Sequence, residues 1–119
     1  MKQARARRAE YLYPKVVEAI ADPTRRRILE LLAKSERGRL AFTEIKRALR
    51  VKNSSALAHH LNMLQRAWLV ERTTDLASPR TAKDPYYCFY SLTRPGEQVT
   101  QRVLSCLEES LSAGLSAAA

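Results

Sequence analysis

The chain has 119 residues, 45% of them apolar, with a formal net charge of +9 and a pI of about 10.1. This length suits one domain with a single core, and the apolar content excludes wholesale disorder. No apolar run reaches the ~18 residues of a membrane span, and the basic start lacks the apolar segment of a secretory signal. We therefore expect a cytoplasmic protein with no membrane partner.

The basic excess lies in the first three quarters of the chain. Residues 1–93 contain 19 basic and 9 acidic residues, whereas residues 94–119 contain 2 and 3. A pI above ~9 in a small domain is typical of polyanion binders, although basicity also serves solubility. Residues 1–93 and residues 94–119 are therefore expected to have different functions.

Two helices are predicted first, after a flexible basic tail over residues 1–8. The first helix covers about 9–20, because Leu12, Val16 and Ile20 recur every fourth position. Asp22 is a suitable N-cap and Pro23 a suitable first residue of the second helix.

The second helix presents Ile28, Leu31 and Leu32 as its apolar face. Arg25, Arg26 and Arg27 lie in its early turns, where the helix dipole disfavours positive charge. These arginines either serve a contact outside the fold or are simply solvated.

Two short helices follow the polar turn SERGRL. In AFTEIKRALRV, Thr43 is expected to be the cap, with Ile45 and Leu49 facing inward. Asn53 is a suitable N-cap for the next helix, over 53–67.

After Trp68, the spacing of the apolar residues changes from the helical period of 3.6 towards the strand period of two. Residues 69–74 and 86–92 are strand-like, and the proline-containing segment 75–85 between them is a loop. A final helix begins near Pro95, and 113–119 is expected to fray. The order of four helices, two strands and a helix indicates a mainly α fold with a β-hairpin wing, the winged helix-turn-helix, over residues 9–112.

The adjacent histidines lie in the helix over 53–67. At 100° per residue, Leu57, Leu61, Leu64 and Trp68 share one face, which we interpret as buried. Ser55, His59, Asn62 and Arg66 share the opposite face. His60 lies on the flank of the core, where we expect a hydrogen-bonded structural imidazole. The two rings diverge by about 100°, which disfavours a shared metal or a catalytic pair.

The polar face suits the major groove of DNA. Arginine can bond to guanine, asparagine to adenine, and serine to base or phosphate. The alternative is an ordinary solvated face.

These segments resemble the ArsR-type winged helix-turn-helix regulators over roughly residues 12–94. ADPTRRRILELL is similar to the opening of their second helix. TEIKRALRVKNSSALAHHLNMLQRAWLVE is similar to their helix-turn-helix, and YYCFYSLT to their second wing strand.

The resemblance implies a sequence-specific regulator of transcription, commonly a repressor, that binds double-stranded DNA as a homodimer. By position, the recognition contacts fall on Ser54, Ser55, Ala56, Ala58 and His59. Trp68 replaces the glycine that usually follows the helix, and we expect it to anchor the hairpin to the core. The third helix lacks Cys-x-Cys and the last helix lacks histidine, so we expect a variant that senses no metal.

The resemblance also places the dimer interface on the first and last helices, whose apolar residues are Leu12, Val16, Ile20, Val99, Val103, Cys106, Leu107 and Leu111. The alternative is that the last helix only covers its own core. The candidate phosphate contacts are Arg25, Arg26, Lys46, Arg47, Arg50, Lys52 and Arg66 near the recognition helix and Arg72, Arg80 and Lys83 in the wing. Arg80 is the candidate for the minor groove.

Cys88 and Cys106 are the only cysteines and show no CxxC spacing. They cannot form a disulfide framework or a four-ligand zinc site by themselves, and we interpret both as buried thiols. No cofactor is expected, and any small-molecule effector is unknown.

Two other functions remain open: a winged-helix module for protein contacts, and a redox-responsive regulator that uses Cys88 or Cys106. An enzyme is not expected, since we find no Gly-rich phosphate loop, spaced carboxylate pair or nucleophile–base motif.

Overall fold

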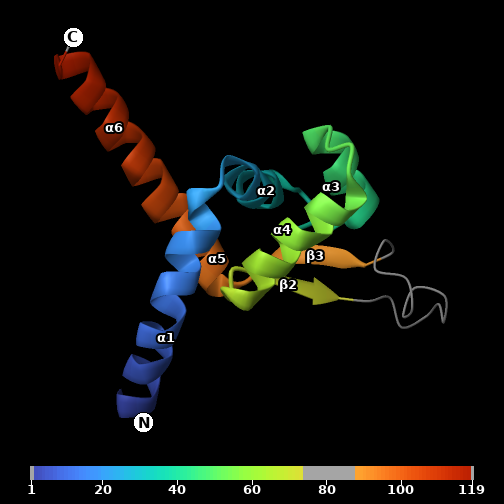
Figure 1. Cartoon of the computed structure of the whole chain (residues 1–119), viewed down its shortest axis with the longest axis horizontal. Helices are drawn as coiled ribbons and strands as arrows, with labels where there is room; N and C mark the ends of the chain where they lie inside the picture. The colour runs from blue at the N-terminus through green and yellow to red at the C-terminus, as the bar shows by residue number, and fades with distance from the viewer. Residues whose placement is uncertain (1, 74–87, 119) are drawn as a thin grey trace.

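Helices and a small sheet surround one apolar core, and two long terminal helices extend from the same side of it (Figure 1). This computed structural model describes residues 2–73 and 88–118, with side chains for 9–73 and 88–116. The elements are α1 (Lys2–Ala21), α2 (Pro23–Lys34), β1 (Leu40–Ala41), α3 (Phe42–Leu49), α4 (Ser54–Arg66), β2 (Val70–Thr73), β3 (Phe89–Leu92), α5 (Arg94–Gln98), a π-helical stretch (Val99–Leu104) and α6 (Ser105–Ala118).

The predicted winged helix-turn-helix fold is confirmed, with one strand added. The sheet is antiparallel in the order β1-β3-β2, and β1 pairs Leu40 with Tyr90 and Ala41 with Phe89. A two-residue strand shows no period of its own, and its partner lies about fifty positions away. β1 therefore has no local signature in the sequence.

Both chain ends differ from the prediction. α1 begins at Lys2, inside the segment expected to be a flexible tail, and α6 continues to Ala118 through the segment expected to fray. Alanine, arginine, lysine and glutamine favour helix, and both segments contain such residues in plenty. In Figure 1 the two helices diverge from the body, while β2 and β3 point to the opposite side.

The core lies between α2, α3, α4 and the sheet. Leu57, Leu61 and Leu64 of α4 are fully buried, as predicted. In α2, Ile28 and Leu32 are buried, as predicted, and Leu31 is partly buried against the core. The prediction missed Leu29, which is fully buried. The other large side chains of the core are Phe42, Ile45, Leu49, Leu69, Val70, Cys88 and Tyr90.

Side-chain caps fix the starts of the helices. Asp22 Oδ1 accepts hydrogen bonds from the N–H groups of Thr24 and Arg25 at 2.8 and 3.2 Å, which confirms the predicted cap. Asn53 caps α4 in the same way. Thr43 is not the cap of α3: that helix starts at Phe42, and Glu44 accepts a hydrogen bond from the N–H of Ala41 at 3.1 Å.

The end of α4 is a tight turn built on Trp68. Leu69 N–H donates to Leu64 O and Trp68 N–H donates to Gln65 O, both at 3.0 Å, the hydrogen-bond pattern of a Schellman motif. Trp68 has a φ of +62°, the left-handed region that favours glycine, and its side chain is 61% exposed. The predictions that Trp68 lies on the buried face and anchors the hairpin to the core are wrong, because the helical 100° step ends at Arg66.

The last helix meets the hairpin base at close range. Thr93 N–H donates to Leu69 O at 3.1 Å, and the Thr93 hydroxyl caps α5 by accepting from Gly96 N–H at 3.0 Å. A Cβ at Gly96 would lie 1.9 Å from Leu69 O, so only glycine permits this approach. The orientation of the last helix is thereby fixed to the wing.

Replacing Trp68 by glycine is expected to stabilise the fold. A left-handed non-glycine residue costs ~1–2 kcal/mol, glycine restores ~0.5–1 kcal/mol of unfolded-chain entropy, and the exposed indole loses little burial. Trp68→Gly should therefore raise the free energy of unfolding by about 0.5–1 kcal/mol, measured by urea denaturation.

Gly38 provides the inverse control. Its φ is +73° and no atom lies within 4 Å of its hypothetical Cβ, so Gly38→Ala tests the backbone conformation alone. It should lower the free energy of unfolding by ~1 kcal/mol. A loss of stability in Trp68→Gly would show that the indole packs favourably despite its exposure.

Candidate nucleic-acid interface

α4 presents the predicted polar face to the outside. Ser55, His59, Asn62 and Arg66 are exposed, while the leucines on the opposite side of the helix are fully buried. The face therefore offers a hydroxyl, an imidazole, an amide and a guanidinium along one side of a capped, rigidly packed helix.

The other recognition positions are less accessible. Ser54, Ala56 and Ala58 are partly buried, and Ala58 packs against the core. Their role as base contacts remains a prediction.

His60 has a structural position at the edge of the core, as predicted. Its Nδ1 lies 3.1 Å from Arg25 Nη1. A guanidinium can only donate, so Nδ1 accepts and the neutral ring carries its proton on Nε2. The His59 and His60 ring centroids are 5.9 Å apart with the planes tilted by 54°.

Arg25 is not available for phosphate, which corrects the prediction. It is only 9% exposed, its Nε donates to Ala19 O at 2.7 Å, and its Nη2 donates to Glu18 O at 3.0 Å. The last carbonyls of a helix lack intrahelical partners, and this guanidinium satisfies two of them while it also holds His60. Arg25 thus ties α1, α2 and α4 together.

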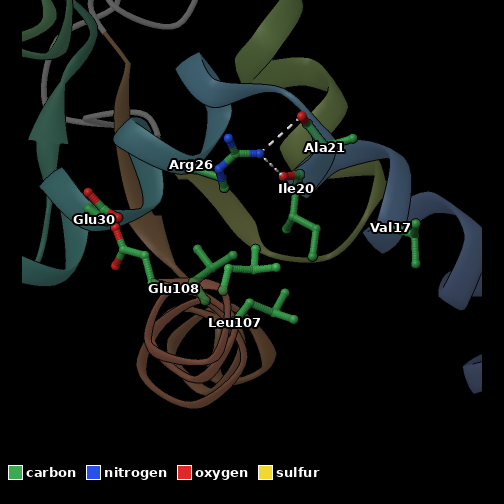
Figure 2. A pocket seen from close by; sticks show the side chains of 9 residues that line it. Val17, Ile20, Ala21, Arg26, Glu30, Leu107 and Glu108 are labelled. Atoms are coloured by element: carbon green, nitrogen blue, oxygen red, sulfur yellow. Dashed lines mark hydrogen bonds between the residues drawn. The ribbon is translucent and has the colours of Figure 1, made fainter. Parts of the chain in front are cut away.

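Arg26 is also engaged within the fold. Its Nη1 donates to Ile20 O at 2.8 Å and to Ala21 O at 3.0 Å (Figure 2). Arg25 fits neither interpretation of the early α2 arginines, because its donors bond to carbonyls and to His60. Arg26 also bonds to carbonyls at the C-terminus of α1 but is partly exposed, so its role as a phosphate contact remains a prediction.

Four predicted phosphate contacts gather around the turn between α3 and α4. Lys46, Arg47, Arg50 and Lys52 line one shallow depression of about 470 Å³. Arg50 has a φ of +56° at the C-terminus of α3, and its left-handed conformation turns the chain towards α4. The structure thus brings four basic side chains together beside the N-terminal end of α4.

The wing is described only at its base. Arg72 is exposed on β2, whereas Arg80 and Lys83 lie outside the described residues. Sequence reasoning missed Arg39, which precedes β1 and stacks over the Phe89 ring at 4.5 Å. It could be placed beside the wing only once β1 was known.

The predicted dimer residues divide into two groups. Val16, Ile20 and Val99 pack against the core of their own chain, and Leu12 is partly buried. Exposed apolar or thiol side chains on the last helix are Val103, Cys106, Leu107 and Leu111. Sequence reasoning missed the exposed Tyr11, Tyr13, Val17 and Leu115.

The exposed apolar groups of α1 and α6 meet in a hollow of about 460 Å³. Val17, Ile20, Leu104, Leu107 and Leu111 line it, with Arg26, Glu30 and Glu108 at its margin. Figure 2 shows Leu107 on the last helix and Ile20 on α1 at this hollow.

The two cysteines differ in environment. Cys88 is buried, whereas Cys106 is exposed, so the prediction of two buried thiols is wrong for Cys106. Across residues 2–73 and 88–118, no three His, Cys, Asp or Glu side chains form a group that could hold a metal ion. No helix in that same part of the chain is long and apolar enough to cross a membrane.

Comparison with known proteins agrees with this geometry. The profile of a helix-turn-helix domain family matches residues 20–73. Among curated proteins no sequence match is found.

Several solved structures share the fold. NadR in complex with 4-hydroxyphenylacetate is 25% identical, with a TM-score of 0.61 over 98% of this chain and 77% of NadR. The Staphylococcus aureus MepR–DNA complex is 17% identical, with a TM-score of 0.63 over 98% of this chain and 89% of MepR. An ArsR family transcriptional regulator is 16% identical, with a TM-score of 0.58 over 87% and 93% of the two chains.

The partly buried position of His60 predicts a pH-dependent stability. Burial lowers its pKa from the ordinary 6.5; Asp22 opposes this shift, while the charges of Arg25 and His59 add to it. The unfolded chain then binds more protons than the folded chain, so stability is complete above pH ~6.5 and falls as the pH decreases through that value.

Urea denaturation between pH 7.5 and 5 measures this dependence. His60→Gln should flatten the slope in this window. His59→Gln, on the exposed face, is the matched control and should retain most of it, because the charge of His59 is the smallest cause of the shift. An unchanged slope in His60→Gln would assign the effect to another group.

Proposed function

We propose that the chain is a dimeric, sequence-specific DNA-binding regulator of transcription. The exposed polar face of α4 is the observation that carries this proposal. α4 enters the major groove, and the wing that begins with β2 and β3 lies against the adjacent backbone or minor groove. The helix-turn-helix match over residues 20–73 supports the assignment to DNA-binding regulators rather than enzymes.

The arrangement of charge supports binding to a duplex. The cluster of Lys46, Arg47, Arg50 and Lys52 lies at the turn that leads into α4, where a phosphate backbone flanks a helix seated in the groove. The MepR structure, with the same fold, is a complex with DNA. Arg66, Arg72, Arg80 and Lys83 extend the proposed backbone contacts.

The dimer is proposed from the apolar surface of α1 and α6. Leu107, Leu111 and Leu115 are 48, 65 and 72% exposed and recur every fourth residue. Together with the adjoining hollow they form an apolar surface that a second copy would cover. This helix also carries little net charge, so two copies repel each other weakly. Two-fold symmetry would place the α4 helices one DNA turn apart, ~34 Å, on a roughly palindromic site.

The finer assignments follow from the sequence resemblance. We propose a repressor of the ArsR type that acts in the cytoplasm without metal. The fold is shared with an ArsR family regulator, which agrees with this assignment.

His59 is expected to set the sequence preference. His59→Ala removes a side chain that can bond to a base edge while leaving the phosphate contacts in place. Selection from a random duplex library should return a different preferred site for His59→Ala. An unchanged site would show that His59 does not read bases.

Arg66 and Arg80 are expected to act without sequence preference. Arg66→Ala and Arg80→Ala should each weaken binding to all duplexes and reduce the slope of log K against log salt by ~1. Fluorescence anisotropy between 50 and 200 mM salt measures both quantities. Arg102→Ala removes an exposed arginine that is not among the proposed contacts, and should leave the slope unchanged.

The dimer surface is tested on α6. Leu107→Glu and Leu111→Glu place a charge in the proposed contact and should give a monomer by analytical ultracentrifugation. Ala113→Glu adds the same charge at an exposed position ~120° or more around the helix from Leu107, Leu111 and Leu115, and should leave the dimer intact. A monomeric wild-type chain at micromolar concentration would contradict the dimer.

A further inference from the structure

A second cleft lies on the other side of α1, against the end of α4. It has a volume of about 620 Å³, within the range of small-molecule sites. Tyr11, Leu12 and Lys15 of α1 line it together with Arg66 and Trp68 at the end of α4. Figure 1 shows α1 passing beside this end of α4.

Trp68 is the unusual member of the cleft. At its left-handed φ of +62° glycine would be less strained, yet the chain places its only tryptophan there and leaves it 61% exposed. Strained residues are kept where they serve a site. Neither the polar face of α4 nor the proposed dimer surface uses this indole.

The opposite wall, on α1, also presents an exposed aromatic side chain and a cation. Tyr11 is 66% exposed, and the Lys15 ammonium lies 4.2 Å from the centre of its ring while donating to its hydroxyl at 2.7 Å. Hydrogen bonding and charge from Lys15 lower the pKa of Tyr11. The cleft thus has an aromatic side chain on each wall. The Lys15 ammonium lies over the Tyr11 ring, and Arg66 lines the wall that holds Trp68.

We propose that this cleft binds a planar aromatic anion of the arene carboxylate class. Its ring would lie against Trp68 and Tyr11, and its carboxylate would accept hydrogen bonds from Arg66 and Lys15. Among the described residues, those that line the cleft include no carboxylate, so the charge of the site is complementary to an anion. Aromatic rings favour stacked or edge-to-face contacts, and a guanidinium binds a carboxylate with two hydrogen bonds.

The probe for this site is 4-fluorobenzoate, observed by fluorine NMR on the full chain. It should bind saturably, and the matched neutral 4-fluorobenzamide should bind at least fivefold more weakly. Cyclohexanecarboxylate, which has the charge without the flat ring, should displace the probe poorly. Equal affinity for the amide, or no saturable binding of 4-fluorobenzoate, would overturn the proposal.

Variants on the two walls locate the site. Tyr11→Ala and Trp68→Gly should each weaken 4-fluorobenzoate binding at least fivefold, although Trp68→Gly is expected to fold more stably than the wild type. Tyr13→Ala removes an equally exposed tyrosine of α1 that does not line the cleft, and should leave binding unchanged. Undiminished binding in both wall variants would place the ligand elsewhere and contradict the proposal.

Self-association through the cleft is the competing outcome. The fluorescence of Trp68 reports on the cleft, because this residue is the only tryptophan. Its emission should shift on adding benzoate and stay constant as the protein is diluted through its dimer dissociation. A shift on dilution with none on adding benzoate would show that a second copy fills the cleft, and would overturn the proposal.

The shared Arg66 connects this cleft to the proposed DNA surface, and this step rests on the proposed function. A carboxylate held by Arg66 removes one phosphate contact, so saturating 4-fluorobenzoate should weaken duplex binding ~3–10-fold. The duplex should weaken 4-fluorobenzoate binding by the same factor. Trp68→Gly should bind duplex without this response. Duplex binding that ignores 4-fluorobenzoate contradicts only this coupling, whereas absence of duplex binding contradicts the proposed function and leaves the ligand test intact.

Discussion

The orientation of α4 depends on one buried guanidinium, that of Arg25. Arg25 donates to the carbonyls of Glu18 and Ala19 at the end of α1 and to His60 Nδ1 in the middle of α4. Three elements are thus joined by the planar donor array of a single side chain, which a lysine could not reproduce. The two carbonyls lie in the last turn of α1, where no intrahelical partner is available, so the same side chain satisfies them and keeps His60 Nδ1 an acceptor.

This constraint determines what α4 can present. His60 and the buried leucines fix the rotation of α4 about its axis. The opposite face therefore points to solvent, and it carries Ser55, His59, Asn62 and Arg66. Asn53 fixes its start and the Schellman turn at Trp68 fixes its end. The hairpin then begins at once, and Gly96 brings the last helix within contact of Leu69. The wing and the terminal helix are therefore placed relative to α4 by backbone contacts, which depend little on surface side chains.

Sequence reasoning succeeded where the controlling interactions are local. The caps at Asp22 and Asn53, the leucine spacing of α4 and the outward polar face all follow from residues within a few positions of each other. It failed where the partner is distant: β1 depends on β3, and the buried state of Arg25 depends on α1 and α4. The sequence alone cannot distinguish the three consecutive arginines Arg25, Arg26 and Arg27. They differ only in the folded chain, by their distance from the C-terminal carbonyls of α1. Trp68 was misplaced because angular spacing assumes that the helix continues.

The same logic limits what net charge says about binding. Arg25 and Arg26 contribute to the +9 of the chain, yet their guanidinium groups bond to backbone carbonyls. Both keep their positive charge, but these donors are already occupied. Lys46, Arg47, Arg50 and Lys52 instead lie around one surface depression, where a phosphate could reach them. α1 then has a wider role than its position at the chain end suggests. Its C-terminal carbonyls hold Arg25, one side of it borders the apolar hollow with α6, and another borders the cleft at Trp68. A ligand or a second copy that shifts α1 would therefore act on α4 through contacts that already exist in the monomer.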